Sequence, residues 1–303
     1  MSCPGALFLM FKALLMTMKP QSFLLSAISV STGTALASLH GPIHWGFYLM
    51  TVLGVILLHS GSNVINDYFD YRQKIDTTEV PGGYGNEARV LIQKMLLPSQ
   101  VLGIALVLFA FSLLIGIYMT AVRGWSILLL GFLGFLTGLL YTVRPVALKY
   151  VALGEAAVFF MWGPLIVSGA YYVQRGGFSL GVIWISVPIG ILVALVLLAN
   201  NIRDIQFDSQ VDIVTLATLF GRRWAVRVYQ FLLLGVYIAT ALLVLEGLLS
   251  LWSFLTFLSL PLALKLVRML QKEIPPDADA RTAQLDGAFG TLFIIAILLE
   301  RFV

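Results

Sequence analysis

The sequence of 303 residues contains one cysteine, three histidines and few charged residues. With Cys3 as its only cysteine the chain cannot form an internal disulfide, which excludes a disulfide-stapled secreted domain. Charged residues make up 11% of the chain, against about 25% in an average soluble protein, so a soluble fold is excluded as well. The first residues lack a basic n-region followed by an A-x-A cleavage site, and we expect no removable signal peptide.

Hydrophobic residues make up 59% of the sequence, and its mean hydropathy is +0.95. One bilayer crossing needs about 20 apolar residues, so nine crossings would use about 180 of them. We therefore predict a single all-α domain over residues 1–303, a multi-pass bundle of nine transmembrane helices. The predicted spans are 22–39, 45–66, 99–120, 124–142, 152–173, 179–202, 225–246, 249–270 and 285–303. Residues 1–17 are too short for a further span and fit an interfacial amphipathic helix.

The basic residues are distributed on one side of this predicted topology. Of the nineteen, only Arg123, Arg175 and Arg301 fall on the side that lacks the N-terminus. The positive-inside rule then places the N-terminus in the cytoplasm and the C-terminus outside a plasma membrane. Thirteen of the fifteen acidic residues lie on the same cytoplasmic side, where 67–98 and 203–224 form long cap loops. The net charge of +4 is a topology signal, and we expect no nucleic-acid partner.

Two acidic clusters follow predicted spans and repeat at a fixed offset. Asn66 and Asp70 follow the second span, and Asn200 and Asp204 follow the sixth, with 134 residues between corresponding positions. Four spans separate the clusters, so both spans run in the same direction. This pattern indicates an internal repeat of a four-helix unit, in which a site typically lies between the halves.

A spacing of four places the polar residues of each cluster on one helix face, as in Asn200, Asp204 and Asp208. Two such faces pointing at each other would gather carboxylates and amides at the membrane edge. Carboxylates that close repel one another unless cations balance them. Oxygen ligands favour Mg²⁺, and the lack of nearby histidine and cysteine argues against zinc.

A solvated loop charge, paired with Arg72, Lys74 or Arg203, would explain any one of these aspartates. Two matched clusters with flanking asparagines favour a site instead. Asp67 and Asp212 fit either a supporting or a surface position.

A third element follows the fourth span on the same side. Tyr141 and Lys149 would border the same pocket, and cations beside metal-bound carboxylates are what a diphosphate requires. Arg144 and Tyr150 fit an interfacial belt equally well. Glu155 is an intramembrane carboxylate that we expect to partner Lys149.

The three elements together resemble the UbiA family of intramembrane aromatic prenyltransferases over nearly the whole chain. The stretches NDYFDYRQKID and NNIRDIQFD are similar to the branch that prenylates 1,4-dihydroxy-2-naphthoate in menaquinone biosynthesis (MenA). The resemblance implies a bundle around a central cavity, with Mg²⁺ and the diphosphate at the cytoplasmic cap. The isoprenoid tail of a geranyl, geranylgeranyl or longer polyprenyl diphosphate would lie in an apolar tunnel open to the lipid bilayer, and no oligomer is required.

On this basis the reaction joins the prenyl carbocation to an electron-rich aromatic acceptor without a side-chain nucleophile. The metal candidates are Asp67, Asp70, Asp76, Asp204 and Asp208. The catalytic candidates are Asp70, Asp204, Tyr141 and Lys149. The substrate-binding candidates are Asn66, Tyr68, Arg72, Lys149, Asn200, Asn201 and Arg203. We interpret His59, one or two turns before the first cluster, as a hydrogen-bonded interior residue rather than a base.

Other acceptors remain open, because Asp212 and Ile213 replace the Gly and basic residue that usually follow the second motif in bacterial naphthoate enzymes. These acceptors are 4-hydroxybenzoate, homogentisate and the geranylgeranylglyceryl phosphate of archaeal lipid synthesis. A secondary transporter also shows repeats and buried charges, but it places them near the bilayer midplane, whereas these acids lie at helix ends.

Overall fold

The computed structural model describes residues 4–75, 89–211 and 213–301. These residues form helices joined by short connections, and strand-type pairing among them is limited to an isolated bridge between Val151 and Val214. Asp76 and Asp212 lie outside the described residues, as does the stretch 76–88 of the predicted cap loop 67–98. The prediction of an all-α fold is confirmed.

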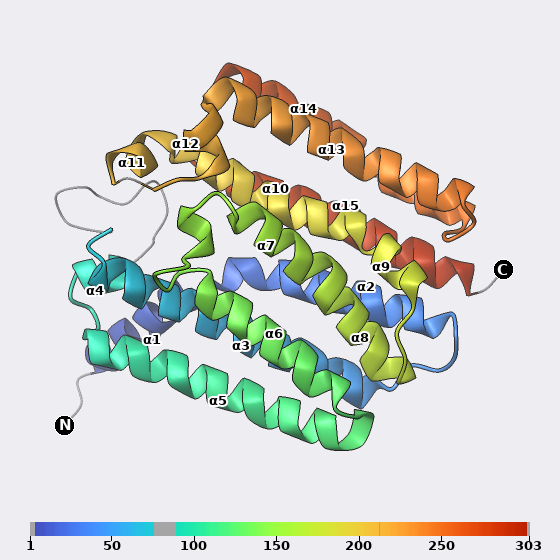
Figure 1. Cartoon of the computed structure of the whole chain (residues 1–303), viewed down its shortest axis with the longest axis horizontal. Coiled ribbons are helices and arrows are strands. Elements are labelled where there is room, and N and C mark those ends of the chain that lie inside the picture. Colours follow the sequence, from blue (N-terminus) through green and yellow to red (C-terminus); the bar gives the residue numbers. More distant parts are fainter. Residues whose placement is uncertain (1–3, 76–88, 212, 302–303) are drawn as a thin grey trace.

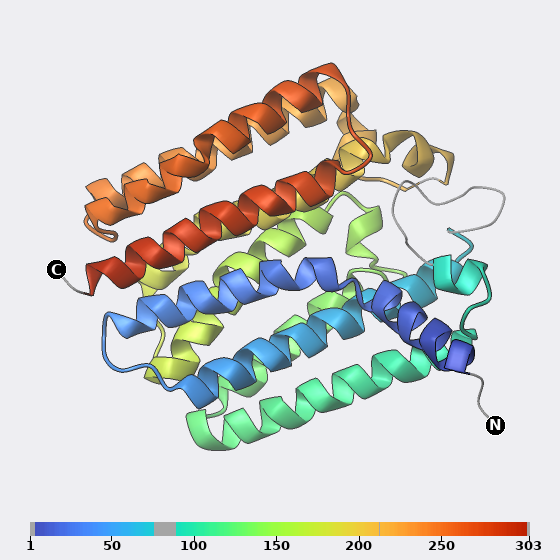
Figure 2. The same ribbon diagram turned by 180° about the vertical axis from the view of Figure 1, so that it is seen from behind.

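Long helices run roughly side by side along one axis (Figures 1 and 2). In chain order they are α2 (Phe23–Ser38), α3 (Trp45–Arg72), α5 (Pro98–Arg123), α6 (Ser126–Leu140), α7 (Gly154–Phe160), α8 (Ile166–Arg175), α10 (Val187–Arg203), α13 (Arg222–Leu245), α14 (Leu260–Lys272) and α15 (Ala278–Glu300). One π-helical turn, η3 (Met161–Leu165), joins α7 to α8, and a 3-10 helix, η4 (Leu251–Ser259), precedes α14. The remaining elements are α1 (Pro4–Met18), η1 (Pro20–Ser22), α4 (Arg89–Ile92), η2 (Leu148–Tyr150), α9 (Leu180–Ile185), α11 (Ile205–Gln210) and α12 (Leu216–Phe220).

Eight helical segments of the described chain are long and apolar enough to cross a bilayer. They match eight of the nine predicted spans. The predicted span 124–142 corresponds to α6, which has 15 residues and is therefore about 22 Å long, shorter than a hydrocarbon core of about 30 Å. The exact count of nine is thus not confirmed, although the chain is a multi-pass membrane protein.

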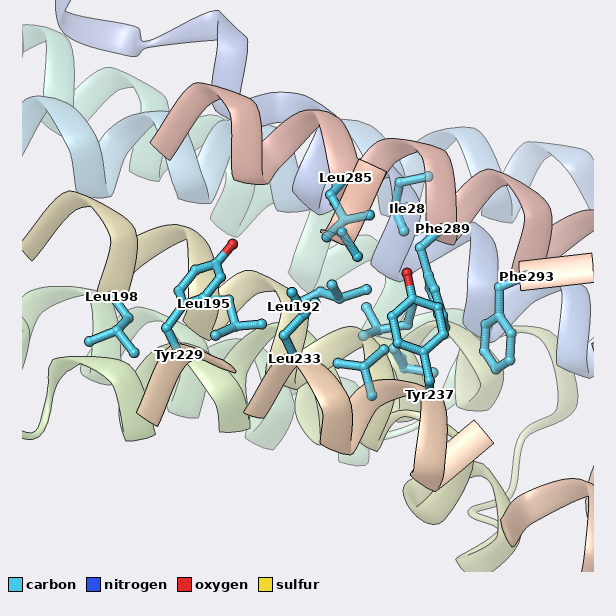
Figure 3. Close-up of a cluster of buried hydrophobic side chains, with 14 of the residues drawn as sticks. Ile28, Leu192, Leu195, Leu198, Tyr229, Leu233, Tyr237, Leu285, Phe289 and Phe293 are labelled. Carbon is cyan, nitrogen blue, oxygen red and sulfur yellow. The ribbon is translucent and has the colours of Figure 1, made fainter. Parts of the chain in front are cut away.

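Helix α10 lies at the centre of the larger core and packs against α13 and α15 (Figure 3). Leu192, Leu195 and Leu198 on α10 face Tyr229 and other large side chains of those two helices, and all are buried. Inside a membrane, close packing and satisfied polar groups hold helices together, because lipid tails are as apolar as the side chains. The hydroxyl of Tyr229 accordingly forms a hydrogen bond of 3.0 Å with Thr282 of α15.

Glycines allow α10 to approach the α7–α8 segment closely. A Cβ atom placed on Gly163 would lie 2.9 Å from the Cα atom of Gly190 and 3.1 Å from the carbonyl oxygen of Ser186. Any larger side chain at Gly163 would push the two helices apart. This contact lies within the turn η3, so the widened helix and the close approach occur together.

The carboxyl ends of α3 and α10 lie at the same end of the bundle, beside α4, α11 and α12 (Figure 1). Helix α3 ends at Arg72 and α10 ends at Arg203, so each acidic cluster occupies the last turn of its helix or the residues that follow. The two helices run in the same direction, as the internal repeat predicts. Helix α15 ends at the opposite end of the bundle.

Candidate active site

A cavity of about 850 Å³ opens between the helices and joins the two acidic clusters. Its polar end is lined by Lys19, Asn66, Asp70, Tyr141, Lys149, Tyr150, Asn200, Asn201, Asp204, Phe207, Asp208 and Asp279. The remainder is mainly apolar and follows α3, α5, α6 and the α7–α8 segment, with side chains such as Phe109, Met119 and Leu165. The structure therefore brings both predicted motifs to one charged pocket that continues into an apolar one.

The apolar part of the cavity reaches the outer surface of the bundle. Leu106 and Leu113 of α5, and Leu128 and Phe132 of α6, line the cavity and are about half exposed. Because these helices face lipid, a hydrocarbon chain in the cavity could extend sideways into the bilayer.

Asp70 is 2% exposed and accepts hydrogen bonds from three side chains. Lys149 Nζ lies 2.7 Å from Asp70 Oδ2, and Asn66 Nδ2 lies 3.1 Å from the same oxygen. The hydroxyl of Tyr150 donates to the other oxygen. Burial raises the pKa of this hydroxyl well above its usual value; the adjacent carboxylate adds to the rise and Lys149 opposes it, so the phenol stays protonated and remains a donor.

Lys149 links the element after α6 to the first motif. Its ammonium also donates to Asn66 Oδ1 at 2.6 Å and lies 4.7 Å from the centre of the Tyr150 ring. The backbone N–H of Lys149 donates to the carbonyl of Tyr141, which holds the short helix η2 over the cavity. Tyr141 and Lys149 thus border the cavity with Asp70, as the sequence predicts.

Asp204 is 9% exposed and is held by its neighbour in the chain. Arg203 Nε lies 2.9 Å from Asp204 Oδ1 and Nη2 lies 2.7 Å from Oδ2, a two-pronged ion pair. Helix α10 ends at Arg203, yet the backbone N–H groups of Asp204 and Asp208 still donate four residues back. The helical spacing of four residues therefore continues from the end of α10 into α11, as predicted. Asp208 lines the cavity as well.

The adjacent asparagines have different partners. Asn201 donates to Glu155 Oε1 at 2.9 Å, and both side chains are buried. The expectation that Glu155 partners Lys149 is wrong, because Glu155 bonds with α10 while Lys149 bonds with α3. Asn200 lines the cavity and accepts a hydrogen bond of 2.6 Å from Arg203 Nη2.

Four predicted residues of the described chain do not line the cavity: Asp67, Tyr68, Arg72 and Arg203. Asp67 is buried one position away from the cavity face of α3 and pairs with Lys19 at 3.1 Å. Tyr68 packs on a separate hydrophobic cluster that includes residues of α5, and Arg72 is exposed. Arg203 is buried behind Asp204, with a side chain that is 3% exposed. We leave these four out of the proposed substrate contacts. Asp76 lies outside the described residues.

The cavity also contains residues that the motifs do not indicate. Lys19 reaches it from the turn before η1, Phe207 from α11 between Asp204 and Asp208, and Asp279 from the start of α15. The spacing of Asp204 and Asp208 could have suggested Phe207, whereas no periodicity links the other two residues to the clusters. The imidazole of His59 also lines the cavity, and its hydrogen bonds to Ser26 at 2.9 Å and Ser22 at 3.4 Å fit an interior residue.

The side chains at the polar end that could bind a metal ion offer carboxylate and amide oxygens, which suit Mg²⁺. No group of three acidic, histidine or cysteine side chains lies close enough to hold one ion in the part of the chain described. Mg²⁺ needs only one or two carboxylates when phosphate oxygens and water complete its six ligands. The buried carboxylates of Asp70, Asp204 and Asp208, separated on two helix ends, therefore fit ions that arrive with a diphosphate.

A pocket of carboxylates, amides and a lysine that continues into an apolar cavity open to lipid fits a substrate with an anionic head and a hydrocarbon tail. Membrane-embedded prenyltransferases act on such substrates. The sequence pattern of the UbiA prenyltransferase family matches residues 6–294, and the chain belongs to this family. It is an aromatic prenyltransferase of membranes.

Known proteins share both its sequence and its fold. The chain is 31% identical to the 1,4-dihydroxy-2-naphthoate octaprenyltransferase of Bacillus subtilis (strain 168), over 94% of this chain and 91% of that protein. It is 30% identical to the UbiA prenyltransferase domain-containing protein 1 of Danio rerio, over 95% of this chain and 84% of that protein. A UbiA homolog from Archaeoglobus fulgidus bound to GPP and Mg²⁺ has the same fold, with a TM-score of 0.65, 13% identity and coverage of 95% of this chain and 99% of that one. For a UbiA homolog from Aeropyrum pernix K1 the TM-score is 0.70, at 14% identity and coverage of 92% and 97%.

Proposed function

We propose that the protein transfers a prenyl group from a polyprenyl diphosphate to 1,4-dihydroxy-2-naphthoate in a Mg²⁺-dependent reaction of menaquinone biosynthesis. One observation carries the proposal of the reaction site: Asp70, Lys149 and Asp204 line the polar end of a single cavity whose other part is apolar. The similarity to the Bacillus subtilis octaprenyltransferase supports the naphthoate acceptor.

In this proposal the diphosphate lies between the two helix ends. Asp70, Asp204 and Asp208 hold Mg²⁺, and Asn66 and Lys149 donate to the phosphate oxygens. When bound, the metal supplies positive charge that stabilises the diphosphate as a leaving group. Asp76, in the proposed cap loop 67–98, remains a further metal candidate.

Lys149 changes partner during binding. In the structure its ammonium neutralises Asp70, and a flexible four-carbon stem lets it turn toward an arriving phosphate. Tyr150 and Asn66 continue to donate to Asp70 and keep the carboxylate in place.

The allylic C–O bond then breaks, and its electron pair leaves with the diphosphate. Tyr141 and Phe207 present aromatic rings to the cavity, and the faces of such rings stabilise a carbocation. A ring carbon of the acceptor attacks, a carbon–carbon bond forms, and the acceptor loses a proton as it regains aromaticity. The apolar walls keep water from the cation.

An assay with purified protein tests the reaction. Geranyl and geranylgeranyl diphosphate are supplied with Mg²⁺ and with 1,4-dihydroxy-2-naphthoate, 4-hydroxybenzoate or homogentisate in separate arms. We expect prenylated naphthoate, and loss of activity in Asp70→Asn and Asp204→Asn. Product only with another acceptor would contradict the naphthoate assignment, and full Mg²⁺-dependent turnover in either variant would contradict the site.

The orientation is part of the proposal: the motif end faces the cytoplasm of a cell with this protein in its plasma membrane. In a Cys3→Ser background, Ser209→Cys lies at the motif end and Gly177→Cys in an exposed turn at the other end. A thiol reagent that does not cross membranes should label position 177 and not position 209 in intact cells. The reverse pattern would invert the topology.

A further inference from the structure

Arg203 lies directly before the cavity-lining Asp204, and its side chain is extensively hydrogen-bonded. A guanidinium has five N–H donors. Two of them hold Asp204, and Nη2 also donates to Asn200 Oδ1 at 2.6 Å. Nη1 donates to Asp279 Oδ1 at 2.6 Å and to the carbonyl of Pro276 at 3.3 Å. All five donors therefore have protein partners, and the side chain is 3% exposed.

This arrangement differs from the one that the sequence predicts for Arg203. To bind a phosphate oxygen, the guanidinium would have to release one of its four protein partners, two of which are carboxylates. Lys149, in contrast, has a flexible ammonium that can exchange partners. Arg203 is better suited to fix Asp204 than to contact the substrate.

Asp279 comes from a part of the chain distant from both motifs. It lies in the first turn of α15, where a negative charge is favourable beside the helix amino terminus. Together with Pro276 it ties the connection between α14 and α15 to the carboxyl end of α10. Asp279 is 33% exposed and lines the cavity, whereas the guanidinium that it contacts is buried.

We propose that Asp279 is a positioning residue, which acts through Arg203 to hold the Asp204 carboxylate in the orientation that receives metal and diphosphate. The proposal rests on the proposed function of Asp204. A two-pronged pair fixes the plane of a carboxylate, but it fixes that plane relative to the guanidinium alone. The ion pair with Asp279 anchors the guanidinium itself to α15, so without it only the neutral acceptors of Asn200 and Pro276 hold the guanidinium in place.

The neighbouring ion pair between Asp277 and Arg281 provides a matched control. It lies at the start of the same helix, has a similar N–O distance of 2.8 Å, and contacts neither Arg203 nor the cavity lining. Both of its side chains are largely exposed. Asp277→Ala therefore removes a carboxylate from the same helix end without affecting the bonds of Arg203.

The test measures binding of inorganic diphosphate by calorimetry at increasing Mg²⁺ concentrations, together with the thermal midpoint and steady-state kinetics. Removing a group that orients a metal ligand typically weakens metal affinity by about 10- to 100-fold. We expect Asp279→Ala to raise the Mg²⁺ concentration for half-maximal diphosphate binding about tenfold. Its KM for the aromatic acceptor should match that of Asp277→Ala. Asp279→Asn keeps an acceptor oxygen in place and should give a smaller rise.

Coupling through Arg203 gives a second readout. In an Arg203→Lys background, Asp279→Ala should cause no further rise in the Mg²⁺ requirement, because a lysine cannot form the two-pronged ion pair through which Asp279 orients Asp204. Equal Mg²⁺ requirements for Asp279→Ala and Asp277→Ala, in a wild-type protein that binds Mg²⁺ and diphosphate, would overturn the inference alone. Failure of the wild-type protein to bind diphosphate with Mg²⁺ would overturn the proposed function and this inference with it.

Discussion

Removal of the ammonium of Lys149 should destabilise the protein even without substrate. Lys149→Met keeps the length of the side chain and leaves Asp70, which is 2% exposed, without its cation. Removing one partner of a buried ion pair lowers the free energy of unfolding by about 3–5 kcal/mol, because the remaining charge is left uncompensated. Tyr150 and Asn66 still donate to Asp70, so we expect the lower end of this range, about 3 kcal/mol.

For a chain of this length, 3 kcal/mol corresponds to a fall of about 5 °C in the thermal midpoint, measured in detergent by intrinsic fluorescence. Adding Asp70→Asn to Lys149→Met removes the uncompensated charge and should restore part of the loss. Lys265→Met, at an exposed position of α14, controls for the substitution itself and should leave the midpoint unchanged within about 1 °C. If the double variant melts no higher than Lys149→Met, the charge of Asp70 is not what the lysine compensates.

Further predictions concern single positions. Tyr150→Phe removes a hydrogen-bond donor to the Asp70 carboxylate, and a hydrogen bond to a charged group contributes about 1.5–3 kcal/mol. We therefore expect kcat in the prenyl transfer assay to fall about 10- to 100-fold. Unchanged turnover would show that this hydrogen bond plays no part in catalysis. Asp286 is fully buried in α15 without a hydrogen-bond partner among the described residues. Because burying an unbonded polar group is unfavourable, Asp286→Val should raise the thermal midpoint. A lower midpoint would reveal a stabilising role for the carboxylate. Gly163→Ala should lower the midpoint by an amount equivalent to about 1–3 kcal/mol, whereas Gly103→Ala, which meets open space, should not; equal midpoints would disprove the close contact.

Sequence periodicity predicted the parts of the site that lie on one helix. Asn66 and Asp70, four positions apart, do share a face and are hydrogen-bonded at 3.1 Å. Asp67 and Tyr68 fall off that face, because each step along a helix rotates the side chain by about 100°. The same rule that located Asp70 could therefore have excluded these two neighbours.

Contacts between distant segments could not be predicted from the sequence. Nothing in the spacing of Asp279 or Lys19 links them to the acidic clusters, since their positions depend on how α15 and η1 pack. The sequence predicts that cations balance the carboxylates, and it favours metal ions as those cations. In the structure the chain itself supplies cations to both motifs, Lys149 to Asp70 and Arg203 to Asp204.

The direction of α3 and α10 has a consequence for the electric field in the cavity. The peptide dipoles of a helix sum to a partial negative charge at its carboxyl end, equivalent to about half an elementary charge. Both motif carboxylates lie at such ends, so backbone and side chains contribute potential of the same sign. The apolar walls screen this potential far less than water does. The polar end of the cavity therefore favours cations, and in the proposed function a diphosphate that brings its own divalent ions would enter a field that favours the complex over the bare anion.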